Sequence, residues 1–257
     1  MRAHYYCDKT LGFSCQFQSG CIFMSGCARA QRTEINKNNE LIVEISGRDK
    51  MARDFISIIK NRRSIKEYSF KEVSNELLSR ILEAGRWAPS AHNAQPWRFI
   101  TIRDPSMKKR LALAMASRWD RDMRKNGLPK EQRENLIKTS VERFENVPVI
   151  IIVCLTVENM DEYPDDRRKK IEYVMAVQSV AAAIENMLLA AHGEGLGSCW
   201  FCAPLFCQDV IRMILKIPQH VDPQALITLG YSAYTPNVPP RKTLEEIVHQ
   251  DHWRHTT

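Results

Sequence analysis

Residues 147–155 are the feature that most constrains the fold of this 257-residue chain. They read VPVIIIVCL, an apolar and largely β-branched run with no polar position in it. Such a run is typical of a strand that is covered on both faces, because a strand with one wet face alternates polar and apolar residues. It is far shorter than the roughly 20 apolar residues of a membrane span. The chain is therefore expected to build a sheet enclosed between other layers.

Helical and strand patterns alternate around this run. The first helix is predicted to open at Met51 and to end near Asn61, and Ser74 is a plausible N-cap for the second. Further helices are expected at 107–116, 131–146, 168–191 and 209–217, and further strands at 97–102, 199–201 and 225–231. The interleaving favours the α+β class, a mixed α/β sandwich, over a helix bundle or an all-β domain.

Residues 1–50 differ from the rest. They carry Cys7, Cys15, Cys21 and Cys27 without a sustained period of 2 or 3.6, and the cysteine spacings do not match a paired CxxC metal pattern. We expect an N-terminal extension that is poorly ordered or results from a mis-assigned start, followed by a single domain over 51–257.

Charge and composition limit the classes of function that the chain can have. Lys plus Arg is 37 against 30 for Asp plus Glu, giving a formal charge of +7 that suits phosphate-bearing ligands. The basic residues are spread along the chain without a recognition motif, so we expect no nucleic-acid partner. No secretory signal or membrane span is evident, and the other four cysteines lie in or beside apolar segments; a reduced, cytoplasmic location is expected.

Three segments combine polar side chains with turn residues. The first holds Arg62, Arg63, Ser64 and Lys66, and such cations with a hydroxyl can grip a phosphate. Taken alone, this segment is more simply interpreted as a solvated basic turn.

The second segment, residues 88–97, reads APSAHNAQPW. Its prolines fix a short loop before a strand, and Ser90, Asn93 and Gln95 can donate and accept hydrogen bonds in the plane of a heteroaromatic ring. A polar loop that caps a helix is the alternative. His92 by itself is interpreted as a loop histidine rather than a ligand or base.

The third segment, residues 193–200, reads GEGLGSCW. It follows a helix and precedes a strand, the reverse of a dinucleotide-binding fingerprint, although its glycines let backbone approach a flat ligand. A helix C-cap with a flexible loop is the alternative. His249, His252 and His255 suggest a frayed tail more than a metal site. The sequence contains no Ser/His/Asp set, HExxH or P-loop, and we name no catalytic side chain and no metal ligand.

In this order and spacing the segments closely resemble the FMN-dependent nitroreductase family. That family has a basic R-R-S-x-K/R segment, an A-P-S-x-x-N-x-Q-P-W loop, G-L-G-S/T-C-W after a long helix, and a late Arg beside prolines, here Arg241. The resemblance runs from about Asp54 to Trp253. It implies a nitroreductase-like fold, with a central mixed sheet flanked by helices and a homodimer built on a long central helix.

The resemblance also implies the ligands and their sites. FMN would be the cofactor and NAD(P)H the co-substrate, with FMN at the interface of the homodimer. Arg62, Arg63, Ser64 and Lys66 would hold the FMN phosphate and ribityl chain, with Arg241 as a further phosphate contact; Ser90, Asn93 and Gln95 would lie at the ring edge; Gly197 and Ser198 would lie near N5 and O4. Hydride would pass through FMN to a conjugated or nitro-type small-molecule acceptor.

Within the family the chain looks most similar to the nitroreductase-like C-terminal domain of the bifunctional enzyme of coenzyme F-420 biosynthesis. The supporting residues are Trp119, Asp120, Asp122, the run 163–168, YPDDRR, and the run 195–200, GLGSCW. A dehydro-deazaflavin precursor is then the specific acceptor, with Arg167 and Arg168 facing its acidic tail, although a solvated helix start is the simpler interpretation of these arginines. The ligase half is absent, and the loop near Asn93 departs from that domain. Alternatives are an oxidative flavin enzyme of the same family and a flavin- or deazaflavin-binding module without turnover.

Overall fold

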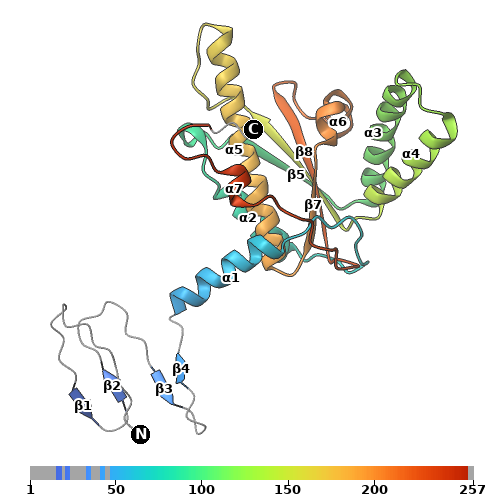
Figure 1. The fold of residues 1–257 in the computed structure, drawn as a ribbon. Helices are drawn as coiled ribbons and strands as arrows, with labels where there is room; N and C mark the ends of the chain where they lie inside the picture. The colour runs from blue at the N-terminus through green and yellow to red at the C-terminus, as the bar shows by residue number, and fades with distance from the viewer. Residues whose placement is uncertain (1–15, 19–20, 24–32, 36–40, 44–46, 254–257) are drawn as a thin grey trace. The chain divides into compact units, whose positions relative to one another are not determined.

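The computed structural model describes residues 16–18, 21–23, 33–35, 41–43 and 47–253, with side chains from 54 to 253 (Figure 1). The chain divides into two units, Met1–Ser57 and Ile58–Thr257. In the first, β1 (Gln16–Gln18) pairs antiparallel with β2 (Cys21–Phe23), and β3 (Thr33–Ile35) with β4 (Leu41–Val43). The side chains of the N-terminal cysteines lie outside the described residues, so the expectations for residues 1–50 stay predictions.

The first helix, α1, spans Gly47–Asn61. It ends where the pattern predicted but starts four residues before Met51, so the predicted start was wrong. The extra turn reads GRDK, whose charged residues carry no apolar period to signal a helix while Arg and Lys still favour one.

Helices and strands alternate through the second unit, as the sequence pattern predicted. The elements are α2 (Asn75–Arg86), η1 (Ala91–Asn93), β5 (Trp97–Ile102), α3 (Pro105–Lys125), α4 (Lys130–Glu145), β6 (Val149–Thr156), α5 (Asp166–Gly193), β7 (Gly197–Phe201), η2 (Ala203–Phe206), α6 (Gln208–Leu215), β8 (Val221–Gly230) and α7 (Leu244–Ile247). Ser74, Asp104 and Asp165 cap α2, α3 and α5 by accepting hydrogen bonds from backbone N–H groups in the first turn.

The four strands of this unit form one sheet in the order β5-β6-β8-β7. All three ladders are antiparallel, which corrects the expected mixed sheet. One parallel pairing exists beside them, an isolated bridge between Ser64 and Ser198. The order follows from the burial of β6, whose eight residues are all buried, so a central place with a partner on each edge suits it.

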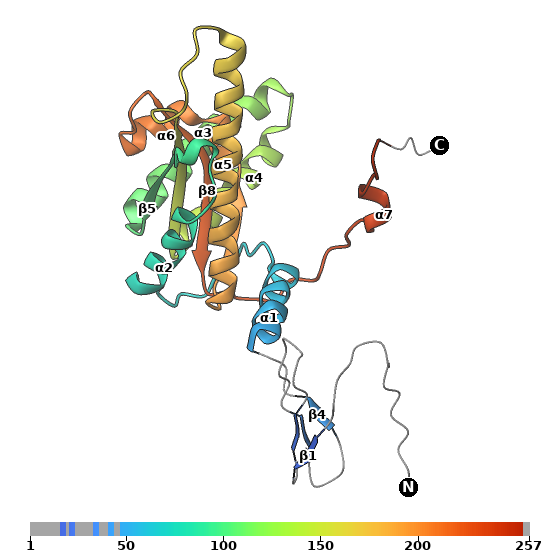
Figure 2. The same cartoon turned by 90° about the vertical axis from the view of Figure 1, so that its left-hand side faces the viewer.

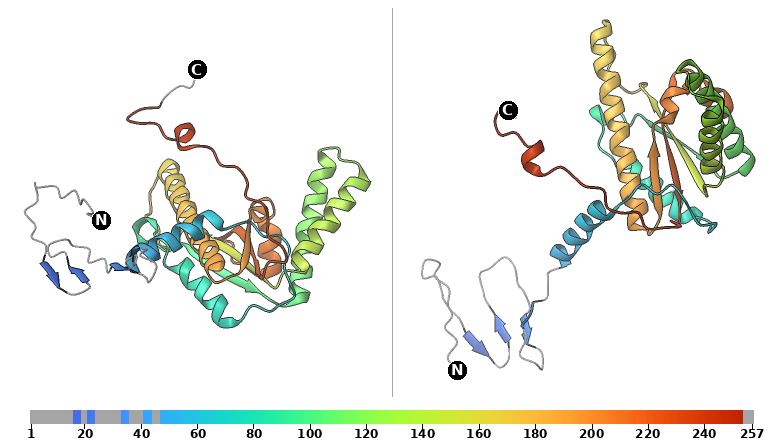
Figure 3. Two further views of the ribbon diagram at one scale, coloured as in Figure 1. Left: turned by 60° about the horizontal axis from the view of Figure 1, so that its bottom comes forward. Right: turned by 45° about the vertical axis from the view of Figure 1, so that its right-hand side comes forward.

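Helices cover both faces of the sheet, and alternate residues of β6 point into two separate cores. Val149, Ile151, Val153 and Leu155 pack with α2 and α5. Ile150, Ile152 and Cys154 pack on the other face with residues of α3, α4 and α6, and the two layers are seen on either side of the sheet in Figure 3. The expected α+β sandwich is confirmed.

The long helix α5 runs along the whole sheet, and Figure 2 looks directly onto it. Among the described residues it is the one helix with the length and apolar composition of a possible membrane span, which core helices of soluble proteins share. Its Ala176, Val180, Ala183 and Ile184 are buried against the sheet. Because a helix rises by about 1.5 Å per residue, α5 also places the candidate site segments relative to one another.

Candidate functional site

The first and third candidate segments lie side by side, although four helices, α2 to α5, and the strands β5 and β6 lie between them along the chain. Ser64 forms the parallel bridge with Ser198, and the Ile65 N–H donates to the Ser198 carbonyl at 2.9 Å. Burial raises the pKa of the Cys199 thiol, an effect that Lys66 and the Ser64 hydroxyl partly oppose. A short strand-like segment after α1 is thus joined to the start of β7, at the edge of the sheet.

Gly197 makes this approach possible. A Cβ there would stand 2.8 Å from Cγ1 of Ile65 and 2.9 Å from its Cβ and Cγ2, closer than real Cβ contacts come. Next to it, Ser198 is 1% exposed, and its Oγ has no hydrogen-bond partner among the described residues. Buried hydroxyls ordinarily form hydrogen bonds, so we expect the Oγ of Ser198 to bond to a group from outside the described residues, such as a ligand.

Cations gather where this segment leaves α1. Arg62 is half-buried and lies 3.9 Å from Glu185 of α5, and two backbone carbonyls accept hydrogen bonds from the Arg63 guanidinium. Burial, with the charges of Arg62 and Arg63, lowers the pKa of His192 near the end of α5. Lys66 is exposed one residue beyond Ile65. The arrangement gives this end of α5 the positive field that an anion such as a phosphate requires.

The second segment is held at a different level of α5. The Ala91 N–H donates to the Ser179 hydroxyl at 3.2 Å, and the Gln95 N–H donates to Ser90 Oγ at 3.1 Å. Asn93 and Gln95 are exposed with φ of 54° and 48°, so the loop is fixed in the left-handed region. Ser179 and His192 are 13 residues apart, which is about 20 Å along the helix. Within one chain, therefore, the structure joins the first and third segments and keeps the second away from them.

Arg241 lies in the exposed C-terminal tail. Its guanidinium donates to the Pro240 carbonyl at 3.4 Å. The tail also exposes apolar side chains, including Val238 and Leu244 at 70% each. The predicted phosphate contact of Arg241 stays a prediction.

Two of the three residues noted at 119–122 line a cavity. It measures about 430 Å³ and has aromatic walls from Trp119, Phe144, Phe201 and Phe206, with Arg118, Asp122 and Arg143 as charged members. Asp120 instead binds Arg133 at 2.8 Å and Arg124 at 2.7 Å, which lowers its pKa. The cavity can accept a flat ring beside cationic groups.

The arginines of the 163–168 run have different surroundings. The Arg168 guanidinium donates to Asp165 and lies 4.5 Å over the Tyr163 ring. Arg167 is exposed at the start of α5.

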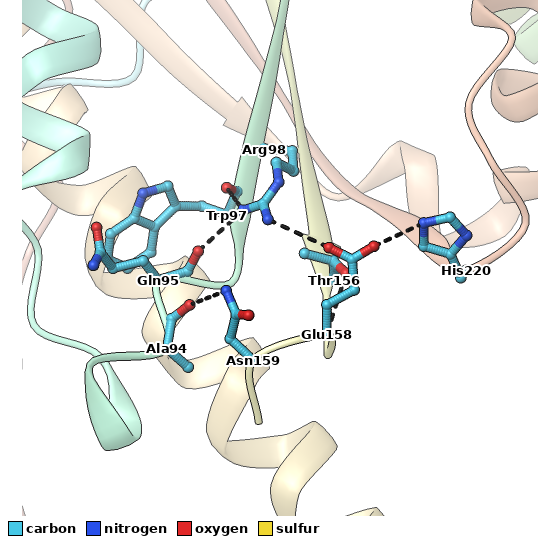
Figure 4. A network of polar contacts seen from close by, with 8 residues as sticks. All are labelled: Ala94, Gln95, Trp97, Arg98, Thr156, Glu158, Asn159 and His220. Atoms are coloured by element: carbon cyan, nitrogen blue, oxygen red, sulfur yellow. Dashed lines mark hydrogen bonds and ion pairs between the residues drawn. The ribbon is translucent and has the colours of Figure 1, made fainter. Parts of the chain in front are cut away.

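A second cavity, of about 770 Å³, lies at the amino-terminal end of α5 and was not foreseen from the sequence. Its lining includes Asp161, Tyr163, Lys169, Glu172 and His220. A polar network ties its rim to the second segment: Glu158 binds His220 at 3.0 Å and Arg98 at 3.5 Å, and Asn159 donates to the Ala94 carbonyl at 3.5 Å (Figure 4).

His92 lies beside this cavity with Asp161 and Glu172. The sequence offered little signal for that grouping, because the two acidic residues sit in an ordinary charged stretch and meet His92 only through tertiary folding.

Comparison with known proteins decides the family. The model of the nitroreductase family matches residues 59–231, which contain the first, second and third segments and the entire sheet. The chain belongs to the nitroreductase family.

Individual relatives agree with that assignment. An Archaeoglobus fulgidus protein named "Putative NADH dehydrogenase/NAD(P)H nitroreductase" is 32% identical over 180 residues, covering 68% of this chain and 84% of the relative. Iodotyrosine deiodinase 1 of Rattus norvegicus is 28% identical over 211 residues, covering 77% of this chain and 69% of the relative. The solved structure of a putative nitroreductase from Desulfovibrio desulfuricans, in complex with FMN, is 28% identical with a TM-score of 0.58. The match covers 78% of the present chain and 98% of the Desulfovibrio chain. The nitroreductase-like fold is therefore confirmed.

Proposed function

We propose that this nitroreductase-family chain is an FMN-dependent oxidoreductase that takes hydride from NAD(P)H and delivers it to a conjugated or nitro-type acceptor. The observation that carries the proposal is the bridge between Ser64 and Ser198, which unites the basic segment with the Gly197 segment at one edge of the sheet. The relative that is solved with FMN supports the cofactor, and the relative named for NAD(P)H supports the donor.

The residues present fit FMN. Arg62, Arg63, Ser64 and Lys66 would hold the phosphate and ribityl chain, since guanidinium and hydroxyl groups are strong phosphate partners. The buried Ser198 Oγ lacks a partner within the described part of the chain, so a polar atom of the flavin ring there would satisfy it. When bound, FMN supplies the hydride chemistry, while the protein orients the ring and its backbone and hydroxyl groups favour the reduced form. Because the flavin supplies the hydride chemistry, the protein needs no catalytic acid–base pair of side chains.

A homodimer would complete the site. The segment of Ser90, Asn93 and Gln95 is anchored at Ser179, about 9 Å along α5 from Glu185 beside Arg62 and about 20 Å from His192, so one chain spreads the three segments along the helix. If two copies of α5 packed antiparallel, the second segment of one chain would come beside the first and third segments of its partner. The half-exposed Ile171 and Val174 of α5 and the apolar tail residues offer surface for such pairing.

We propose further which compound accepts the hydride. A dehydro-deazaflavin precursor of coenzyme F-420 is the specific candidate from the sequence, and the cavity of about 430 Å³ with Trp119 and Arg143 suits a flat anionic compound. Its acidic tail could engage Arg167, since Asp165 already holds Arg168.

An oxidative or dehalogenating flavin enzyme is the second candidate. The 28% identity with iodotyrosine deiodinase 1 favours it. A binding module without turnover is the remaining alternative. We expect a cytoplasmic protein in each case.

An absorbance spectrum across the flavin bands, from the near ultraviolet into the blue-green, tests the class when it is taken before and after anaerobic NADPH. Flavin bands that bleach support the oxidoreductase, and bands that persist with both NADPH and NADH support a binding module.

Replacing Arg62 and Arg241 together by Ala tests the phosphate assignment. We expect FMN to be lost on gel filtration. Arg110→Ala with Arg121→Ala, which removes two exposed arginines of α3, is the matched control and should retain it. Full retention of FMN in the first double variant would refute the phosphate assignment.

A further inference from the structure

Three side chains with metal-ligand chemistry converge beside the larger cavity, at the amino-terminal end of α5. His92 comes from η1, Asp161 from the loop after β6, and Glu172 from α5. One ligand atom of each lies within 4.8 Å of the other two. His92 Nε2 is 3.5 Å from Glu172 Oε2 and 3.9 Å from Asp161 Oδ2. An imidazole with two carboxylates is a donor set that divalent transition metals accept.

Glu172 is the member that points to a ligand. Its side chain is 9% exposed, and its Oε2 has no hydrogen-bond partner within residues 54–253. A buried carboxylate without compensation is costly, because it has lost its water without gaining donors. The imidazole of His92 stands 3.5 Å away, beyond the roughly 2.7–2.9 Å of a charge-assisted hydrogen bond.

The spacing suits a shared cation better than a direct ion pair. Ligand atoms about 2.0–2.2 Å from a tetrahedral metal stand about 3.3–3.6 Å from each other. The His92–Glu172 distance of 3.5 Å falls in that range. The exposed Asp161 is 3.9 Å from His92 and within 4.8 Å of the Glu172 ligand atom, so its carboxylate would have to move toward both to share the ion.

The three ligands are also held in place by their elements. The Ala91 N–H donates to Ser179 of α5, which anchors η1 against the helix that carries Glu172. The Asn159 amide donates to the Ala94 carbonyl, which ties the loop before Asp161 to the loop of His92 (Figure 4). These two hydrogen bonds thus connect the loop of His92 to α5 and to the loop that carries Asp161.

We propose that His92, Asp161 and Glu172 bind a divalent transition-metal ion of the Zn²⁺ class through His92 Nε2 and two carboxylate oxygens. Three protein ligands leave a coordination position for water or another oxygen ligand. Asp161 and Glu172 line the cavity, so that position is accessible from it, beside Lys169 and His220. His92, interpreted as a loop residue from sequence alone, thereby becomes a ligand.

Calorimetric titration of the purified FMN-loaded full chain with ZnCl₂, in a phosphate-free buffer, tests the proposal. His92→Asn and Glu172→Gln are the test variants, because Asn tolerates the φ of 54° at position 92 and Gln keeps the shape of Glu172. His220→Asn is the matched control, since it removes an imidazole from the same cavity that is 61% exposed and outside the triad. All variants keep the eight cysteines, so zinc bound by thiols cancels in the comparison.

We expect one zinc equivalent to disappear, or to bind at least about 100-fold more weakly, in both test variants and to persist in the control. Zinc should also raise the melting temperature of the wild type and of the control more than that of His92→Asn. Circular dichroism checks that each variant folds. If the buried substitution Glu172→Gln unfolds the chain, the exposed Asp161→Asn replaces it in the titration. Isotherms of His92→Asn and Glu172→Gln that match the wild type would overturn the proposal, as would equal loss in His220→Asn.

Discussion

At position 197 the structure leaves no room for a side chain, because Ile65 packs directly against the glycine. Gly197→Ala adds one methyl group 2.8–2.9 Å from three atoms of Ile65, one of which is the Cβ that cannot rotate away. Ile65 is 6% exposed and has little room to shift. Overpacking of this kind costs about 1–3 kcal/mol, and at about 2–4 °C per kcal/mol we expect the melting temperature to fall by about 2–12 °C.

A double-mutant cycle separates this steric cause from a general effect of replacing glycine. Ile65→Ala removes two of the three clashing atoms, although it costs about 2–5 kcal/mol itself as a buried truncation. In the Ile65→Ala background, Gly197→Ala should therefore cost at least about 1 kcal/mol less than in the wild type. Gly193→Ala is the control: its Cβ would meet Ile58 at an ordinary 3.4 Å, and as a helical glycine it should be neutral or slightly stabilising.

Urea unfolding followed by circular dichroism gives the four free energies, and the ratio of flavin to protein absorbance reports the site. The same shift that relieves the clash parts Ser64 from Ser198, so Gly197→Ala should also weaken FMN retention. The proposed close approach would be refuted by additive effects in the cycle, or by a Gly197→Ala variant within about 0.5 kcal/mol of the wild type, the range of an ordinary surface substitution.

Two further predictions concern titratable groups. The pKa of His192 is lowered in the folded state, so the unfolded state binds more protons, and the free energy of unfolding should fall as pH drops below about 6.5. His192→Gln should reduce this pH dependence of the melting temperature, and an unchanged dependence would contradict the assignment. Burial raises the pKa of Cys154 to about 12 and of Cys207 to about 11, so only about one Cys154 thiol in 10⁴ is ionised at pH 8. In timed iodoacetamide labelling with peptide mapping, exposed Cys202 should react before the three buried cysteines Cys154, Cys199 and Cys207, and rapid labelling of Cys154 would show that its strand opens.

Much of the secondary structure follows from local pattern. The strand at 97–102 was predicted to the residue, and β6 nearly coincides with the apolar run. The helix predicted at 107–116 instead continues as α3 to Lys125, because its last turns are charged rather than apolar and are supported by Arg118–Asp122 and Asp120–Arg124 pairs. The 3.6-residue period of apolar residues indicates which part of a helix packs on the core, and it gives no signal for turns whose residues are mostly charged.

The sequence by itself determined the class of fold, the approximate place of the core elements and the family, since buried strands, caps and ordered motifs are visible in local patterns; β7 and β8 nevertheless begin two and four residues earlier than predicted. It did not determine that the sheet is antiparallel, because strand direction depends on how the connections cross the faces. Only the tertiary structure joined Ser64 to Ser198 and anchored the loop of Asn93 at Ser179, at a different level of α5. It alone brought His92, Asp161 and Glu172 together, because long-range packing, which no local spacing encodes, decides which distant side chains share one cavity.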